Sequence, residues 1–137
     1  MEKAGEVLED FGIENEIRVL SAHKTPDEAI EFAAAASDQG FEVIIAGAGK
    51  AAHLAGVMAA KSLLPVIGVP ISASLDGMDA LLATVQMPTG IPVATVAIDG
   101  STNAALLAVA MLAINDADLA NALAQFRQEL AAKTLAG

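Results

Sequence analysis

The sequence contains no cysteine, tryptophan or tyrosine, and it has 7 lysines and arginines against 17 aspartates and glutamates. Without cysteine, the chain can form neither disulfides nor thiolate metal sites. The net charge of −10 argues against nucleic acid or an anionic membrane as a partner, because both are bound through basic surfaces. Any anionic ligand must therefore be small and held by a few local groups.

The N-terminal residues lack the pattern of a secretory signal. Glu2, Lys3 and Glu6 stand where a signal would have basic residues and then an apolar block. The longest uncharged run, residues 80–98, is broken near its middle by prolines and a glycine, which indicates a turn rather than a membrane span. We therefore expect a cytoplasmic protein that inserts in no membrane.

What the chain does have is apolar residues, which make up 55% of its 137 positions, while charged residues make up 18%. This composition excludes disorder and predicts one domain, residues 1–137, with a sizeable core. Because so short and apolar a chain has little polar surface with which to cover itself, we also expect an oligomer. The nearly uncharged helical pattern of residues 101–115 and the C-terminal helical pattern of residues 116–135 are the expected subunit contacts.

Helical and strand patterns alternate along the chain almost without linkers. The helical patterns cover residues 2–11, 26–39, 51–64, 77–86, 101–115 and 116–135. The strand patterns cover residues 17–20, 41–46, 65–71 and 92–98. This alternation predicts a three-layer α/β/α fold built on a parallel sheet.

His23 is the first candidate for chemistry. The stretch from Ser21 to Asp27 joins the expected strand 17–20 to a helix, and ligands of parallel α/β sheets sit at the carboxyl ends of strands. Thr25 followed by Pro26 is typical of a helix start, whose free N–H groups favour an anion. The alternative is that Ser21 and Thr25 only cap the helix and His23 is an ordinary loop residue.

A glycine-rich turn, Gly47 to Gly56, follows the second expected strand and opens the third helix. Such a turn lets the backbone approach a ligand closely and leaves amide groups free for an anion. The pattern is weak, since it is neither a dinucleotide fingerprint nor a P-loop: Lys50 is followed by alanine instead of serine or threonine. A tight turn without a ligand is the alternative.

Five motifs occur in an order that resembles one family, the N5-carboxyaminoimidazole ribonucleotide mutases of purine biosynthesis, called PurE. They are Ser21-Ala22-His23-Lys24-Thr25-Pro26, Gly47-Ala48-Gly49-Lys50-Ala51-Ala52-His53-Leu54, Pro65 to Pro70, Val85 to Pro88, and Gly90 to Val96. The resemblance runs over essentially the whole chain. The second motif favours the mutase branch over the animal-type carboxylases, which use free CO2.

The resemblance implies a flavodoxin-like octamer with active sites made between subunits, without metal or organic cofactor. In such an enzyme, the substrate comes from an ATP-dependent carboxylase. The mutase then moves the carboxylate of the aminoimidazole ribonucleotide from an exocyclic nitrogen to ring carbon C4, by decarboxylation and recarboxylation. The resemblance further implies that His23 shuttles the proton. The implied substrate-binding residues are Ser21, Ala22, Lys24, Gly47, Ala48, Gly49, Ala51, Ala52, His53 and Leu54. Lys24 stands where the family more often has arginine, and Lys50 where it commonly has glycine.

Members of the family open with an apolar strand and a Gly-Ser-x-Ser-Asp loop, and neither pattern is found here. That first strand would lie in the middle of the sheet, beside the strands expected at residues 17–20 and 41–46. Two hypotheses follow: an isomerase whose record is truncated at the N-terminus, or a non-catalytic oligomer that binds phosphorylated ligands weakly. A carboxylase using free CO2 is a further alternative.

Overall fold

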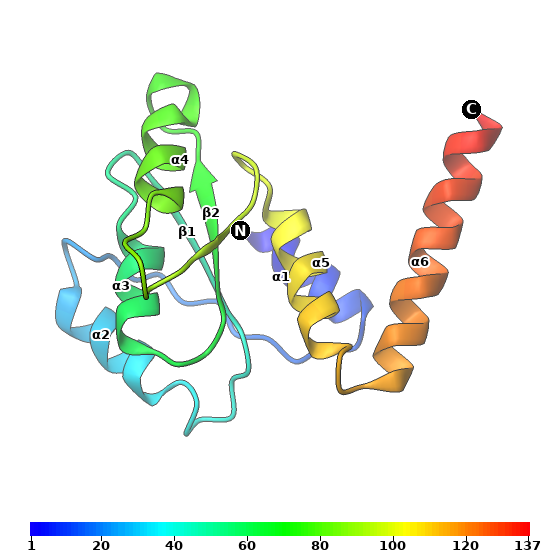
Figure 1. Cartoon of the computed structure of the whole chain (residues 1–137), viewed down its shortest axis with the longest axis horizontal. Coiled ribbons are helices and arrows are strands. Elements are labelled where there is room, and N and C mark those ends of the chain that lie inside the picture. The colour runs from blue at the N-terminus through cyan, green and yellow to red at the C-terminus, as the bar shows by residue number, and fades with distance from the viewer.

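A computed structural model describes residues 1–137 as alternating helices and strands (Figure 1). The helices are α1 (Glu2–Asp10), α2 (Pro26–Ala35), α3 (Leu54–Lys61), α4 (Met78–Val85), α5 (Ser101–Leu112) and α6 (Ala117–Ala136), and a 3-10 turn, η1, covers Leu75–Gly77. The strands are β1 (Ile44–Gly49), β2 (Val66–Ile71) and β3 (Ala94–Thr95). All three strands are parallel, in the order β1-β2-β3. The predicted α/β fold on a parallel sheet is confirmed.

Helices cover both faces of the sheet, which makes three layers. Helices α2, α3 and α4 lie on one side, α1 and α5 lie on the other, and most of α6 stands away from the body (Figure 1). Alternation along β1 and β2 explains the division, because successive side chains of a strand point to opposite faces. Ile44 and Val66 pack with α2 and α3, whereas their neighbours Ile45 and Ile67 pack with α1 and α5.

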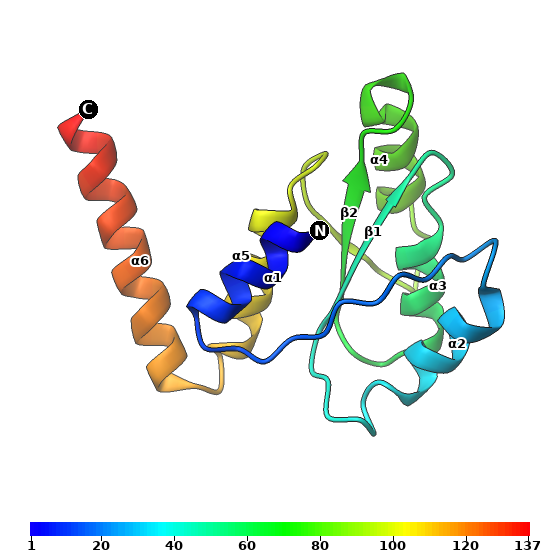
Figure 2. The ribbon, with the colours of Figure 1, turned by 180° about the vertical axis from the view of Figure 1, so that it is seen from behind.

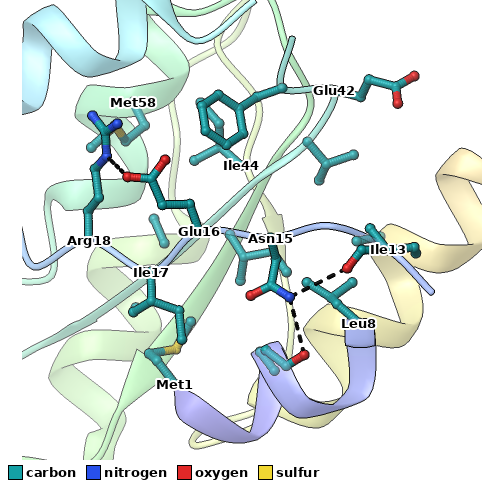
Figure 3. A pocket seen from close by; sticks show the side chains of 18 of the residues that line it. Met1, Leu8, Ile13, Asn15, Glu16, Ile17, Arg18, Glu42, Ile44 and Met58 are labelled. Atoms are coloured by element: carbon teal, nitrogen blue, oxygen red, sulfur yellow. Dashed lines mark hydrogen bonds and ion pairs between the residues drawn. The ribbon is translucent and has the colours of Figure 1, made fainter. Parts of the chain in front are cut away.

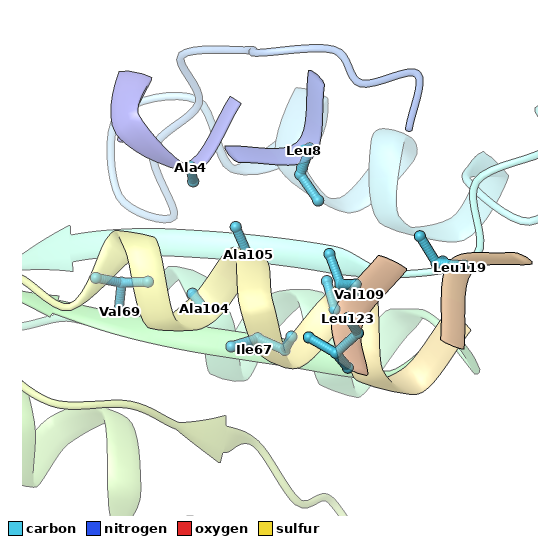
Figure 4. Packing of buried hydrophobic residues seen from close by; sticks show 10 residues of the cluster. Ala4, Leu8, Ile67, Val69, Ala104, Ala105, Val109, Leu119 and Leu123 are labelled. Atoms are coloured by element: carbon cyan, nitrogen blue, oxygen red, sulfur yellow. The ribbon is translucent and has the colours of Figure 1, made fainter. Parts of the chain in front are cut away.

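The core on the α1 and α5 face is built largely from small side chains (Figure 4). Ile67 and Val69 of β2 are fully buried there, against alanines of α5 and Leu8 of α1. Because alanine lets helices approach closely, the few large side chains suffice to fill the layer. The abundance of alanine and the scarcity of aromatics therefore reflect tight helix packing.

Residues 17–20 form no strand, which corrects the sequence-based prediction of four strands. The segment between α1 and α2 is extended but pairs with nothing, and it crosses beside the sheet without joining it (Figure 2). Val19 is 97% exposed. A run of β-branched residues becomes a strand only where a neighbouring strand accepts its hydrogen bonds, and none lies beside it.

Several predicted boundaries are wrong, although the elements themselves are present. The strand expected at 41–46 is β1, Ile44–Gly49, since pairing with β2 runs from Ile44↔Val66 to Gly49↔Ile71. The strand expected at 92–98 shrinks to β3, and the helices expected at 26–39 and 51–64 are the shorter α2 and α3. No helix combines the length and the apolar character needed to cross a bilayer.

Candidate functional site

The loop that carries His23 is held by hydrogen bonds among its own residues. The Ser21 Oγ accepts the backbone N–H of His23 at 3.3 Å and that of Lys24 at 3.1 Å. The Thr25 hydroxyl accepts the Ser21 N–H at 2.9 Å and donates to the Ser21 carbonyl at 3.2 Å. These bonds fix the backbone on both sides of His23, so the imidazole is presented from a defined turn.

Thr25 is the N-cap residue of α2 and Pro26 begins the helix, as predicted, but the threonine side chain makes no bond to the helix. Its hydroxyl is used by the Ser21 turn instead, so the expected side-chain cap is wrong. The first turn of α2 carries Asp27 and Glu28, which already place negative charge at this helix end. Lys24, exposed beside them, is the cation that this loop can offer to an anion.

The glycine-rich turn begins inside β1 rather than after it. Gly47, Ala48 and Gly49 are the last residues of the strand, so their backbone is held by the sheet. A Cβ on Gly49 would lie 2.9 Å from the Ala73 Cβ and 3.2 Å from the Ile71 carbonyl oxygen, so only glycine fits there. The chain then turns through Lys50, Ala51 and a buried Ala52 to reach α3.

The two histidines of the chain meet across these two loops. His23 Nε2 lies 2.8 Å from His53 Nδ1, and the rings are edge to face with centroids 4.9 Å apart. His53 is the N-cap residue of α3, and its own N–H donates to the Ala51 carbonyl at 2.9 Å. Both imidazoles are exposed. A hydrogen bond between two ring nitrogens requires that one donates and one accepts, so the pair can hold and transfer a proton at solvent-accessible atoms.

A third loop, after β2, lies against the same edge of the sheet, and no site residue was predicted from it. The Ser74 hydroxyl donates to the Asp79 carboxylate, and this bond is the main reason that the pKa of Asp79 lies below its usual value. The positive charge of Lys50 acts in the same direction, whereas desolvation acts against it. The sequence could have indicated this loop, because it follows an expected strand and the carboxyl ends of neighbouring parallel strands meet at one edge of the sheet.

The residues predicted from the motifs thus fall into three groups. His23 and His53 are in direct contact. Ser21, Ala22 and Lys24 lie in the turn that carries His23, and the remaining predicted residues lie in the end of β1 and its turn into α3. Fold and site together define a three-layer α/β protein with a histidine pair beside the carboxyl end of a parallel sheet.

Comparisons with known proteins place this architecture in a family. The family model described as AIR carboxylase matches residues 1–133. The N5-carboxyaminoimidazole ribonucleotide mutase of Pyrococcus abyssi is 54% identical over 131 residues, which are 95% of this chain and 75% of that protein. The phosphoribosylaminoimidazole carboxylase of Saccharomyces cerevisiae is 54% identical over 127 residues, which are 92% of this chain and 22% of that protein.

The fold agrees with a solved structure of the same kind. The crystal structure of Treponema denticola PurE superposes with a TM-score of 0.86 at 30% identity, covering 98% of this chain and 84% of that one. The chain belongs to the AIR carboxylase family, and the resemblance to the PurE mutases drawn from its motifs is confirmed.

Proposed function

We propose that this protein converts N5-carboxyaminoimidazole ribonucleotide to 4-carboxy-5-aminoimidazole ribonucleotide, with His23 as the proton-transfer residue. The observation that carries the proposal is the 2.8 Å contact between His23 Nε2 and His53 Nδ1, in a chain whose relatives carry the mutase name. The relatives support the reaction, and the contact supports the choice of residues.

The reaction is an isomerisation, so its atoms balance without a co-reactant. The bond from the exocyclic nitrogen to the carboxylate breaks, CO2 is released, and the nitrogen gains a proton. Ring carbon C4 then forms a bond to the same CO2 and loses its proton. One group must therefore give a proton to nitrogen and take one from carbon, and imidazole, whose pKa is ordinarily about 6.5, does both near neutral pH.

His53 orients His23 in this proposal. Its Nδ1 contacts the Nε2 of His23, so the tautomer of one ring sets that of the other. The side chains of Ala48, Ala51 and Leu54 supply the apolar wall that retains CO2, whereas the predicted Ala52 is buried within the chain.

Lys24 and Ser21 bind the phosphate. The Ser21 Oγ already accepts two backbone N–H groups, and its own proton has no acceptor in the chain, which suits a phosphate oxygen. Lys24 supplies the positive charge, although an ammonium lacks the two-pronged geometry of a guanidinium. Gly47 and Gly49, together with Ala22, shape the rest of the binding surface.

The proposal extends to the setting of the enzyme. The protein works in the cytoplasm as an octamer, with sites completed between subunits, and receives its substrate from an ATP-dependent carboxylase. The exposed histidine pair supports this arrangement, since a site that must exclude water needs a cover that one subunit does not provide.

His23→Asn tests the assignment. We expect mutase turnover to fall by about 100-fold or more, the usual contribution of a general acid–base, with no change in melting temperature. His53→Asn, which keeps a polar atom near the Nδ1 position, should reduce turnover less than His53→Ala. Lys61→Gln, at the far end of α3, is the matched control and should change nothing. Wild-type turnover in His23→Asn would refute the role.

The carboxylase alternative is separated by a second assay. With aminoimidazole ribonucleotide and bicarbonate as substrates, we expect product to form much more slowly than from the carboxylated substrate. Efficient product formation from bicarbonate would identify the protein as a carboxylase, and failure with both substrates would favour the non-catalytic alternative.

A further inference from the structure

All the residues other than glycine that have a left-handed backbone lie in loops that follow a strand. Lys50 follows β1 with a φ of +56°, and Leu75 and Asp76 follow β2 with φ values of +46° and +53°. Asp99 follows β3 with a φ of +57°. Such conformations persist only where the surrounding structure holds them. The contacts around Lys50 therefore help to fix the turn that leads to His53.

The turn after β1 lies directly against the loop after β2. Pairing of the two strands continues to the last residue of each, so the chain leaves the sheet at neighbouring points. A Cβ on Gly49 would lie 2.9 Å from the Ala73 Cβ. Ser74, the next residue, donates its hydroxyl to the Asp79 carboxylate. These contacts bring Lys50, which follows Gly49, to the side of the loop that Asp79 holds.

Asp79 binds both the loop after β2 and the first turn of α4. One of its oxygens accepts the Ser74 hydroxyl, and the other accepts the Ala80 N–H at 2.9 Å. The Ser74 bond is the main cause of the lowered pKa of Asp79, and the Ala80 bond and the charge of Lys50 add to it. The carboxylate is therefore ionised at neutral pH and attracts the Lys50 ammonium.

Lys50 has no carboxylate in direct contact. The one ion pair with nitrogen and oxygen in contact joins Arg18 to Glu16, at the cavity beside β1 that Figure 3 shows. Neither Lys50 nor Asp79 lines that cavity. Lys50 is exposed, so its attraction to Asp79 acts over a longer distance and through solvent. Salt weakens an attraction of this kind.

A short, constrained turn connects Lys50 to the histidine pair. His53 is separated from Lys50 only by Ala51 and the buried Ala52, and its N–H donates to the Ala51 carbonyl at 2.9 Å. So short a turn absorbs little displacement, so a shift of Lys50 moves the ring that lies 2.8 Å from His23. Misplacement of a reacting group by about 1 Å can lower a rate about 100-fold.

We propose that Lys50 and Asp79 are positioning residues, whose mutual attraction holds the turn that carries His53 against the loop after β2. The pair thereby keeps His53 aligned with His23 and does not itself touch the substrate. Both charges are required, so the loss of either one should have the same effect. The inference rests on the proposed function, in which the two histidines move the proton.

The test is a double-variant cycle in the full chain. Lys50→Gln removes the positive charge but keeps a side chain of similar length, and Asp79→Asn removes the negative charge but keeps an oxygen for the Ser74 hydroxyl. We expect each variant to lower kcat by about twofold to fivefold, the range of an exposed charge pair, without changing KM. The double variant should be no slower than the slower single variant.

Two further variants and a salt titration separate charge from structure. Lys50→Arg keeps the charge and should keep the unaltered kcat. Lys61→Gln removes an exposed cation from the last turn of α3 and is the matched control, with kcat unchanged. Raising salt from about 0.05 M to about 0.5 M should lower kcat of the unaltered chain but not of Lys50→Gln. Unaltered kcat in Lys50→Gln, or multiplied losses in the double variant, would overturn the proposal.

Hydrogen exchange of the His53 amide gives a readout that requires no turnover. We expect this amide to exchange about twofold to fivefold faster in Lys50→Gln and Asp79→Asn than in the unaltered chain or Lys61→Gln. A chain without mutase activity that shows this pattern would refute the proposed function and support the positioning role. Equal exchange in all the variants would overturn the positioning role, even in an active enzyme.

Discussion

Lys50 adopts a backbone conformation that residues other than glycine rarely take. Its φ is +56°, in the left-handed region, and it stands in the turn between β1 and α3 that leads to His53. Glycine adopts this conformation without a steric cost, whereas an L side chain is disfavoured there. Strain of this kind clusters at functional sites, and here it lies between the two elements that place the histidine pair.

Replacing Lys50 by glycine should therefore stabilise the fold. We expect Lys50→Gly to raise the free energy of unfolding by about 0.5–1 kcal/mol, because relief of the left-handed strain outweighs the added flexibility of the unfolded chain. Urea denaturation measures the effect. Lys50→Ala distinguishes the effect of the backbone from that of the charge. It removes the ammonium group but keeps the Cβ, so the free energy of unfolding should not rise. Equal gains in both variants would assign the effect to charge.

At the scale of elements, β2 is the strand on which the other elements are assembled. Its first five residues are buried, and it pairs with β1 on one side and β3 on the other. Gly68, at its middle, lets α4 approach: an added Cβ would overlap the Thr84 Cγ2 and would lie 2.9 Å from the Val93 Cγ1. The sheet and α4 can therefore pack at this distance only over a residue without a side chain.

Gly68→Ala should destabilise the protein by about 1–3 kcal/mol, the usual cost of forcing an extra carbon into a packed core. Thr84→Ser removes the nearest methyl group and keeps a hydroxyl that can make the 2.7 Å bond to the Ala80 carbonyl. The double variant should recover part of the loss, as measured by chemical denaturation. Additive effects of the two changes would show that the methyl group is not the obstacle.

At the scale of the whole molecule, α6 is the helix whose apolar side chains the single chain leaves largely uncovered. Leu119 and Leu123 are buried, and Phe126 meets the ring of Phe11 with centroids 5.8 Å apart. Every residue from 124 to 137 is exposed, and the helix projects away from the body (Figure 1). An isolated helix end gains little stability by itself, so an apolar residue such as Leu130 on it favours contact with another subunit.

We expect the protein to be a multimer in solution, and Leu130→Glu to shift it toward smaller species. Leu130 is 54% exposed in the single chain, and burying such a side chain in an interface contributes about 1.5–3 kcal/mol. Light scattering at micromolar concentration measures the change. Leu63→Glu, on an exposed leucine of the body, is the control and should leave assembly unchanged. A monomeric unaltered chain would contradict the expectation.

Much of the fold follows from local patterns. Helices α1, α4, α5 and α6 lie close to where apolar spacing, glycines and Asp116 predict them, because each pattern acts within a few residues. Asp116 caps α6 by accepting the Leu119 N–H at 2.9 Å. The order of the motifs likewise identified the family. His53 follows a true strand, β1, whereas the apolar run before His23 forms none, so that run did not by itself place His23 beside the sheet.

Tertiary contacts decided the rest. Residues 17–20 have the composition of a strand but form none, because a strand requires a neighbouring strand to accept its hydrogen bonds and they pair with none. The extent of β1 was set by its register with β2, and the 2.8 Å contact of the two histidines by the meeting of loops 30 residues apart. Local sequence encodes propensity, whereas pairing and proximity depend on what the folded chain brings alongside.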